Sequence, residues 1–348
     1  MLVFYGIDIF INYLFTTMKL FFLLFLLTGY FYSQENYNLY HEKINKAEKL
    51  YFIENKIDSA IYYYDKAFDE YSFNFLRDIV NCAQIAKLNK KPYLKYIYKG
   101  FEYGLKLEKL NNYPIFQNEV LKLKKDKTVN AIYTKARKKY IEGIDFEYLN
   151  WLQDVTIKDQ SEKEKSNYKR IIATTLNKFE KKILEKGFPG ERIIGISDSL
   201  IFYEINKPYL SLKEKIKRKG DKSLNYFFKT DDEDNMAYLG LILLVHDCCA
   251  YNQLSKILKD EITKGNIHPR DVGMVADNAL RYHGEMEQPY LLNIFARSKY
   301  TNEHRADTKK INKVRRKLGV NSIEVDNAKL EFEAKYNLKL VSGFFYCR

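Results

Sequence analysis

The sequence predicts a mainly α protein, in which a short array of helical hairpins is followed by a second domain that is all-α or mostly α. Two observations support this fold class. Apolar residues recur at spacings of three and four along much of the chain, which is the period of a helix buried on one face. The second half of the chain shows neither a series of strand hairpins nor a regular alternation of strands with helices.

A short apolar segment near the start of the chain predicts export. Lys19 directly precedes an apolar run over residues 20–32, and the small residue Ser33 separates that run from polar sequence. This order is typical of a secretory signal peptide, and the run is shorter than the roughly 20 residues that a membrane-spanning helix needs. We therefore expect residues 1–33 to act as a signal peptide read from Met18, and the mature protein to be periplasmic or extracellular.

A membrane-anchored form is the alternative. Residues 1–17 are also apolar, with Asp8 as their one charged residue, so residues 1–32 together would make a longer hydrophobic anchor. No cysteine lies between Leu20 and Gln34, so the lipid attachment of bacterial lipoproteins has no acceptor there. We expect contact with a membrane only through this N-terminal segment.

The charge pattern argues against a nucleic-acid partner. The net charge is +13, but lysines alternate with acidic residues, as over residues 181–186, which is typical of solvated helix faces. The most basic patches are residues 215–219 and 309–317. Given the export signal, we expect no nucleic-acid partner. Beyond the leader about 315 residues remain, enough for two domains, which we place at residues 34–142 and 143–348.

The cysteines and histidines predict neither a metal nor a cofactor. Cys82, Cys248, Cys249 and Cys347 form no C-x-x-C pair, which argues against a structural zinc site. The histidines show no His-x-x-x-His spacing either. Cys248 and Cys249 lie in an apolar helical run, where they are most simply buried small side chains. The sequence does not decide whether one of them forms a disulfide with Cys347.

The first domain begins with two short helices over residues 41–68. Ala47, Leu50 and Tyr51 lie on one face of the first helix, and residues 55–58 make a turn. The second helix has a face of small and large apolar residues spaced by three and four, namely Ala60, Ile61, Tyr64, Ala67 and Phe68.

The pattern of small and aromatic residues in this hairpin resembles a tetratricopeptide repeat. A second copy follows 33 residues later, with Tyr93, Ile97 and Gly100 at the corresponding positions. A third helix pair, over residues 113–124 and 128–140, keeps the helical period without the repeat signature. The resemblance implies either binding of a protein or peptide on a concave face or plain scaffolding, and the sequence leaves both open.

The second domain begins after residues 143–145 and is expected to be helical. Residues 187–190, Gly-Phe-Pro-Gly, combine both strong chain breakers and therefore predict a turn. The apolar periodicity predicts helices over residues 146–163, 167–186, 237–266, 270–283, 302–318 and 326–336.

Residues 146–325 resemble an uncharacterised bacterial domain family of unknown function that is often found in exported proteins. The resemblance lies in pieces that follow one another in the same order, namely Asp159-Gln160, Gly187-Phe188-Pro189, Ile194-Gly195, His246, Ala276-Asp277, Gly284, Gln288-Pro289-Tyr290 and residues 314–319. The chain departs from the family pattern at Asn278, where an arginine is usual, and at residues 291–293, where a small-residue turn and a glutamine are usual.

A group of polar residues in this domain forms the candidate site, namely Asp159, Gln160, His246, Asp247, Asp277 and Gln288. His246 follows an apolar run, and a buried histidine needs a polar partner because an unpaired one costs about 1–3 kcal/mol. Asp159 or Asp277 would hold its tautomer and let it act as the general base of a hydrolase-like enzyme. The competing interpretation is a histidine in a structural polar network. The leading hypothesis for function is therefore an exported interaction or scaffold module of the envelope, and the hydrolase is the alternative.

Overall fold

Helices make up the secondary structure of the described residues, so the mainly α prediction is confirmed. The computed structural model describes residues 18–19, 35–196, 201–205, 208–220, 239–246, 250–282, 289–292 and 307–340, without the side chains of 246 and 280–282. Within these ranges no helix is both long and apolar enough to cross a bilayer. Most of the predicted signal peptide lies outside the described residues, and so do Cys248, Cys249 and Cys347.

The first hairpin consists of α2 (Tyr37–Phe52) and α3 (Ile57–Glu70). The small and aromatic residues chosen from the sequence form its interior, because Ala60, Tyr64 and Ala67 are each 0% exposed. The chain turns between the two helices with a left-handed residue, Asn55, at φ 55°, and asparagine is one of the residues that tolerates this conformation.

The second hairpin consists of α4 (Leu76–Leu88) and α5 (Leu94–Glu102). A small residue is required at Gly100, where an added Cβ would lie 2.9 Å from Leu105 Cδ2. The chain then continues through η1 (Leu107–Asn112), η2 (Pro114–Phe116), α6 (Gln117–Lys125) and α7 (Lys127–Glu142). The third pair is therefore present, with the 3₁₀ turn η2 where the sequence predicted the start of its first helix.

The second half of the chain packs around its own apolar cluster, which begins with Tyr140 and extends to Val320. Asp145 caps the first of these helices, since its carboxylate accepts a hydrogen bond from Tyr148 N at 2.8 Å. The helices of this half are α8 (Phe146–Glu162), α9 (Tyr168–Lys186), α10 (Glu191–Ile194), α11 (Ile201–Glu204), α12 (Leu212–Lys219), α14 (Leu239–His246), α15 (Ala250–Thr263), α16 (Pro269–Tyr282) and α18 (Thr308–Leu318).

Two of the expected helices are described only in part. Within the helix predicted over residues 237–266 the structure describes α14 and α15, and because residues 247–249 lie outside the described ranges, the continuity of this helix remains a prediction. α15 ends at Thr263 because the chain turns at Gly265, with φ +75° and the Tyr37 ring 2.6 Å from the position of an added Cβ. The helix expected from residue 302 is described from Thr308, which Asp307 caps through Lys309 N and Lys310 N.

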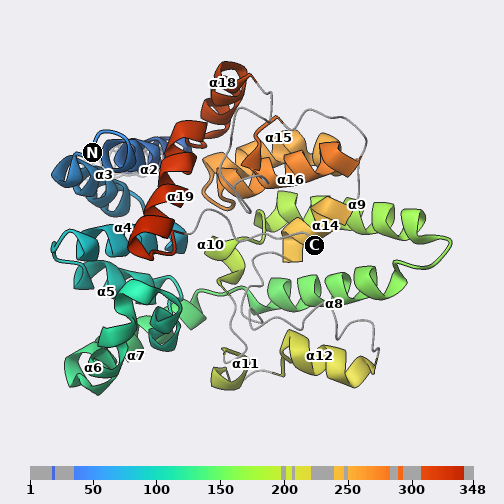
Figure 1. The fold of residues 1–348 in the computed structure, drawn as a ribbon. Coiled ribbons are helices and arrows are strands. Elements are labelled where there is room, and N and C mark those ends of the chain that lie inside the picture. Colours follow the sequence, from blue (N-terminus) through green and yellow to red (C-terminus); the bar gives the residue numbers. More distant parts are fainter. Residues whose placement is uncertain are drawn as a thin grey trace, which may run out of the picture. The chain divides into compact units, whose positions relative to one another are not determined.

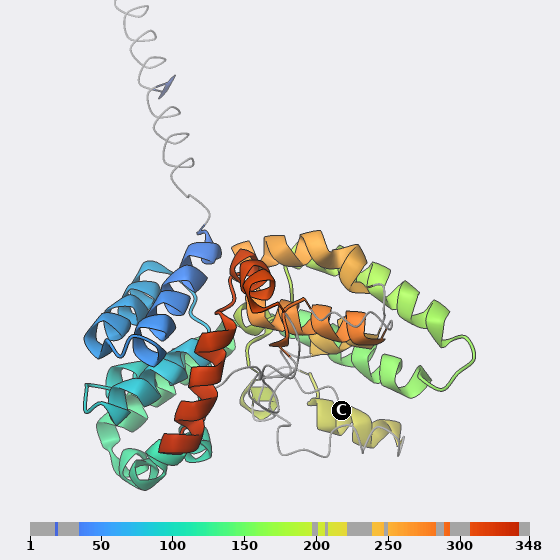
Figure 2. The same cartoon turned by 45° about the horizontal axis from the view of Figure 1, so that its top comes forward.

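The last helix, α19 (Ile323–Tyr336), returns to the first half of the chain. Figures 1 and 2 show it in red beside α2, and Val325, Leu338 and Leu340 belong to the same apolar cluster as the hairpins. The described residues therefore contain two large apolar clusters, and the C-terminal segment contributes to the one formed by the hairpins. The proposed boundary at residues 142–143 remains a prediction.

Candidate functional site: a buried charge cluster

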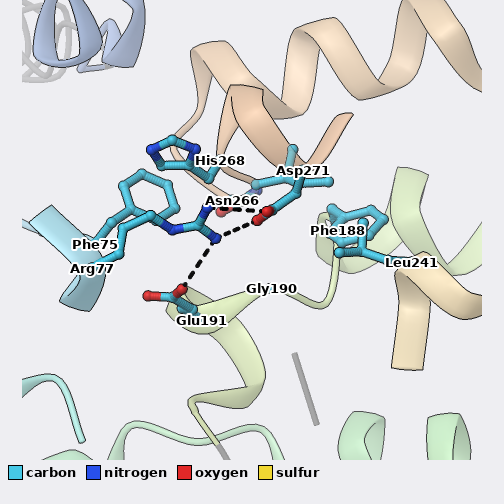
Figure 3. Close-up of a pocket in the computed structure, with 10 residues that line it drawn as sticks. Phe75, Arg77, Phe188, Gly190, Glu191, Leu241, Asn266, His268 and Asp271 are labelled. Carbon is cyan, nitrogen blue, oxygen red and sulfur yellow. Dashed lines mark hydrogen bonds and ion pairs between the residues drawn. The ribbon is translucent and has the colours of Figure 1, made fainter. Parts of the chain in front are cut away.

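A buried ion pair joins the first half of the chain to the second. Arg77, at the start of α4, is 2% exposed and donates two hydrogen bonds to Asp271 of α16, at 3.0 Å (Nη1–Oδ1) and 2.5 Å (Nη2–Oδ2). Glu191 of α10 lies on the other side of the guanidinium, with Oε1 3.7 Å from Nη2 (Figure 3). Its second oxygen accepts a hydrogen bond from Leu76 N at 3.1 Å. Three helices are thus tied together by charge-assisted hydrogen bonds.

A small cavity lies beside this ion pair (Figure 3). Its volume is about 10 Å³, which is room for roughly one water molecule. The residues that line it are Phe75, Arg77, Phe188, Gly190, Glu191, Leu241, Asn266, Ile267, His268 and Asp271. An organic substrate does not fit in such a space.

Two histidines and an aspartate lie next to Arg77. The rings of His41 and His268 meet edge to face with centroids 4.9 Å apart. Asp78 Oδ1 lies 4.0 Å from His268 Nε2, and Asp78 Oδ2 accepts a hydrogen bond of 2.9 Å from Tyr40 Oη. His268 Nδ1 accepts a hydrogen bond from Arg270 N at 3.1 Å, so the proton of the neutral ring is on Nε2 and faces Asp78.

Burial sets the protonation of this group. It lowers the pKa of His41 to about 3 and, with Arg77 nearby, holds the pKa of His268 well below its usual value. Burial also raises the pKa of Asp78 to about 7, with the charge of Glu48 acting in the same direction. Both imidazoles are therefore neutral at pH 7. The arrangement resembles an acid–base pair, but its surroundings admit no more than a water molecule.

A second buried network joins the C-terminal helix to the rest of the chain. Asp326 of α19 accepts hydrogen bonds from Arg270 at 2.9 and 3.0 Å and also from Arg315. Burial by itself raises the pKa of Asp326, but the guanidinium groups of Arg270 and Arg315 outweigh it and hold this pKa below its usual value. Lys329, one turn further along α19, donates to Glu48 of α2 at 2.6 Å. These pairs hold the first half of α19 in place.

The predicted site residues Asp159 and Gln160 are adjacent on α8. Asp159 is 1% exposed and accepts hydrogen bonds from Tyr168 Oη at 2.6 Å and from Gln160 Nε2 at 2.9 Å. These contacts connect the end of α8 with the start of α9. They give Asp159 a structural role in the helix pair.

The predicted site residue Asp277 stabilises a loop. It is 0% exposed, and its two oxygens accept hydrogen bonds from Tyr290 N at 2.9 Å and Leu292 N at 2.6 Å. Burial raises its pKa to about 7 although these bonds favour the charged form. His246 ends α14, but its side chain, Asp247 and Gln288 lie outside the described side chains. The convergence of these residues with Asp159 thus remains a prediction.

The sequence interpretation missed the charged cluster around Arg77. Its members lie in helices that read as ordinary amphipathic segments, and Arg77 and Asp271 are 194 positions apart. One signal was available, because Arg77-Asp78 are the only charged residues in the stretch from Tyr71 to Ala86. In the described part of the chain, no three His, Cys, Asp or Glu side chains are placed to hold a metal ion. Cys82 is a free thiol, and it is buried.

No protein-family model matches the chain, and neither the curated proteins nor the solved structures include a significant match. The resemblances to tetratricopeptide repeats and to an exported bacterial domain therefore rest on the residues quoted above.

Proposed function

We propose that this protein is a non-catalytic interaction and scaffold module, exported to the bacterial envelope, whose helical hairpins bind an extended segment of polypeptide. The observation that carries this proposal is a contact on α4. The side-chain amide of Gln84 donates to Lys339 O at 2.6 Å and accepts from Lys339 N at 3.0 Å. One side chain of the hairpin array therefore satisfies both backbone groups of a residue that follows α19.

The burial of the charged cluster supports a structural role for its titratable groups. Arg77, Asp78 and Asp271 are each less than 10% exposed, and the adjoining cavity has room for about one water molecule. Catalysis on an organic substrate requires reacting groups that the substrate can reach. The cluster instead joins helices from both halves of the chain, as a scaffold needs.

The outer face of the first hairpin leaves further surface for a partner. Tyr62 on α3 is 53% exposed and meets Tyr63 edge to face, with centroids 5.5 Å apart. Lys66 lies 5.3 Å from the centre of the Tyr62 ring, and Lys46 lies 5.5 Å from that of Tyr63. Tyrosine is enriched in protein interfaces relative to the rest of the protein surface. Neither tyrosine belongs to the apolar cluster of the second half of the chain.

The test separates an interaction protein from an enzyme. The full-length chain is immobilised and used to capture proteins from envelope extract, and each candidate is then purified and titrated by calorimetry. We expect stoichiometric binding by at least one purified candidate, with the same affinity for the wild type and for His246→Ala. If none of the purified candidates binds, and the chain hydrolyses a substrate that His246→Ala leaves intact, the hydrolase alternative replaces this proposal.

A further inference from the structure

The segment after α19 lies on the hairpins with alternating burial. Leu338 is 6% exposed and Leu340 is 1% exposed, whereas Lys339 between them is exposed. Both leucines belong to the apolar cluster of the hairpins. A period of two in burial is the pattern of a strand-like segment with one face on a surface. The hairpin array therefore accommodates two aliphatic side chains that are separated by one residue.

The polar contact to this segment does not depend on the identity of its side chain. Gln84 is 0% exposed and uses both atoms of its amide on the backbone N–H and C=O of Lys339. Any residue other than proline offers the same donor and acceptor. The site therefore recognises three consecutive residues. The first and the third are aliphatic, and the second is any residue with a backbone N–H.

The segment makes fewer charged contacts with the hairpins than the first half of α19 does. The first half of α19 is fixed by the buried Asp326 and Lys329, but residues 334–337 are exposed. Between these parts, Phe332 is half-buried against Tyr51 and Phe52, with ring centroids 5.4 and 5.2 Å apart. Regions with few buried contacts open at the lowest free energy in a folded protein. Separating the chain beyond Lys329 from the hairpins would therefore break none of the buried ion pairs that hold the first half of α19.

We propose that the face of α4 around Gln84 is a binding site for a partner protein's extended segment with two aliphatic residues one position apart, and that residues 338–340 occupy this site until the partner displaces them. The inference rests on the proposed function and adds the location and the chemistry of the bound segment. A tethered occupant acts at an effective concentration near millimolar. A partner peptide therefore binds only weakly until the resident segment is released.

The probe is a fluorescein-labelled peptide with the sequence of residues 328–340, and binding to full-length chains is followed by fluorescence anisotropy. Leu340→Asp places a charge at a buried position and releases the resident segment, so we expect this variant to bind the peptide at least about tenfold more tightly than the wild type does. Adding Gln84→Ala to it removes two neutral hydrogen bonds and should lower that affinity by about tenfold. The control variant is Leu121→Asp on α6, a leucine that is 72% exposed, which should bind the peptide as the wild type does.

Two results would overturn the inference. One is equal affinity of the peptide for the wild type and Leu340→Asp, and the other is binding that survives Gln84→Ala unchanged. A peptide with Asp at both leucine positions should not bind to any of the chains. A partner that passes the calorimetric test but binds Leu340→Asp and the wild type equally would remove this site and leave the proposed function standing.

A measurement on the wild-type chain avoids the risk that Leu340→Asp fails to fold. Hydrogen exchange is followed by mass spectrometry, and we expect peptides covering residues 330–340 to exchange at least about a hundredfold faster than those covering α4. Equal protection of both would show that the segment is a permanent part of the core. Light scattering would detect a concentration-dependent dimer if two copies of the chain exchanged this segment. That result would show that the occupant is a second copy and would refute the proposal of a different partner protein.

Discussion

Replacing Asp326 by asparagine should destabilise the whole fold. This carboxylate is 2% exposed and accepts two hydrogen bonds from Arg270 and one from Arg315, which is itself 0% exposed. Asp326→Asn keeps the shape of the side chain but removes its charge. Two buried guanidinium groups then lose their shared counter-ion, and the amide has one oxygen left to accept from them.

The expected loss is large because the charges that remain are buried. Removing one partner of a buried ion pair typically costs about 3–5 kcal/mol, and Asp326 neutralises two cations. A domain's free energy of unfolding is about 5–15 kcal/mol in total. Asp326→Asn should therefore lose at least about 3 kcal/mol, which is a fifth or more of the stability of a typical domain. The carboxylate contributes this stability above its usual pKa, and the contribution disappears as the pH falls through its lowered folded-state pKa.

Urea denaturation followed by circular dichroism at neutral pH measures this loss. The matched control is Glu142→Gln, which removes a surface ion pair with Lys138 across 4.0 Å, both side chains being more than half exposed. The control should change the free energy of unfolding by less than about 0.5 kcal/mol. If Asp326→Asn loses less than about 1 kcal/mol, the network around α19 does not hold the fold together and the reasoning is wrong.

Three further outcomes are expected. Burial raises the pKa of Asp78 to about 7, so between about pH 4 and 7 the folded chain keeps a proton on Asp78 that the unfolded chain has lost. The wild type therefore loses stability as the pH rises through this range, whereas Asp78→Asn does not. Urea titrations should show the variant gaining roughly 1 kcal/mol per pH unit relative to the wild type. Gly190→Ala places a Cβ 2.1 Å from Asn266 O and should lower the free energy of unfolding by about 3 kcal/mol, whereas Gly220→Ala meets no atom within 4 Å and should cost about 1 kcal/mol. Ser211→Ala removes the capping box of α12 and should cost about 1 kcal/mol in the same urea assay, and a free energy of unfolding equal to that of the wild type would contradict this expectation.

The helices were predictable from the sequence because their signal is local. Ala60, Tyr64 and Ala67 reveal a buried face by their spacing alone, and all three are fully buried. The turn at residues 187–190 was predictable for the same reason, since α9 ends at Lys186 and Gly187 has φ +87°. Patterns of this kind depend only on the period of the helix and on the residues that break it.

The charged cluster was not predictable because its partners are distant in sequence. Arg77 meets Asp271, and Lys329 meets Glu48 281 positions away, and no periodic pattern links such positions.

Asp277 shows the opposite case. It stood out in the sequence as a candidate catalytic group, but its partners are the backbone N–H groups 13 and 15 positions later. A sequence alone does not distinguish an aspartate that binds backbone N–H groups from one that transfers a proton in catalysis.

The two ends of α19 are held by different forces, and that difference links the scaffold to binding. Its first half depends on charges that lose several kcal/mol when unpaired, so it cannot leave the core without unfolding much of the chain. The contacts of the following segment with the hairpins come from two leucines and one amide, Gln84, and such contacts can be replaced by the same groups of another protein. A rigid anchor next to an exchangeable segment gives the hairpin face a fixed shape with a replaceable occupant.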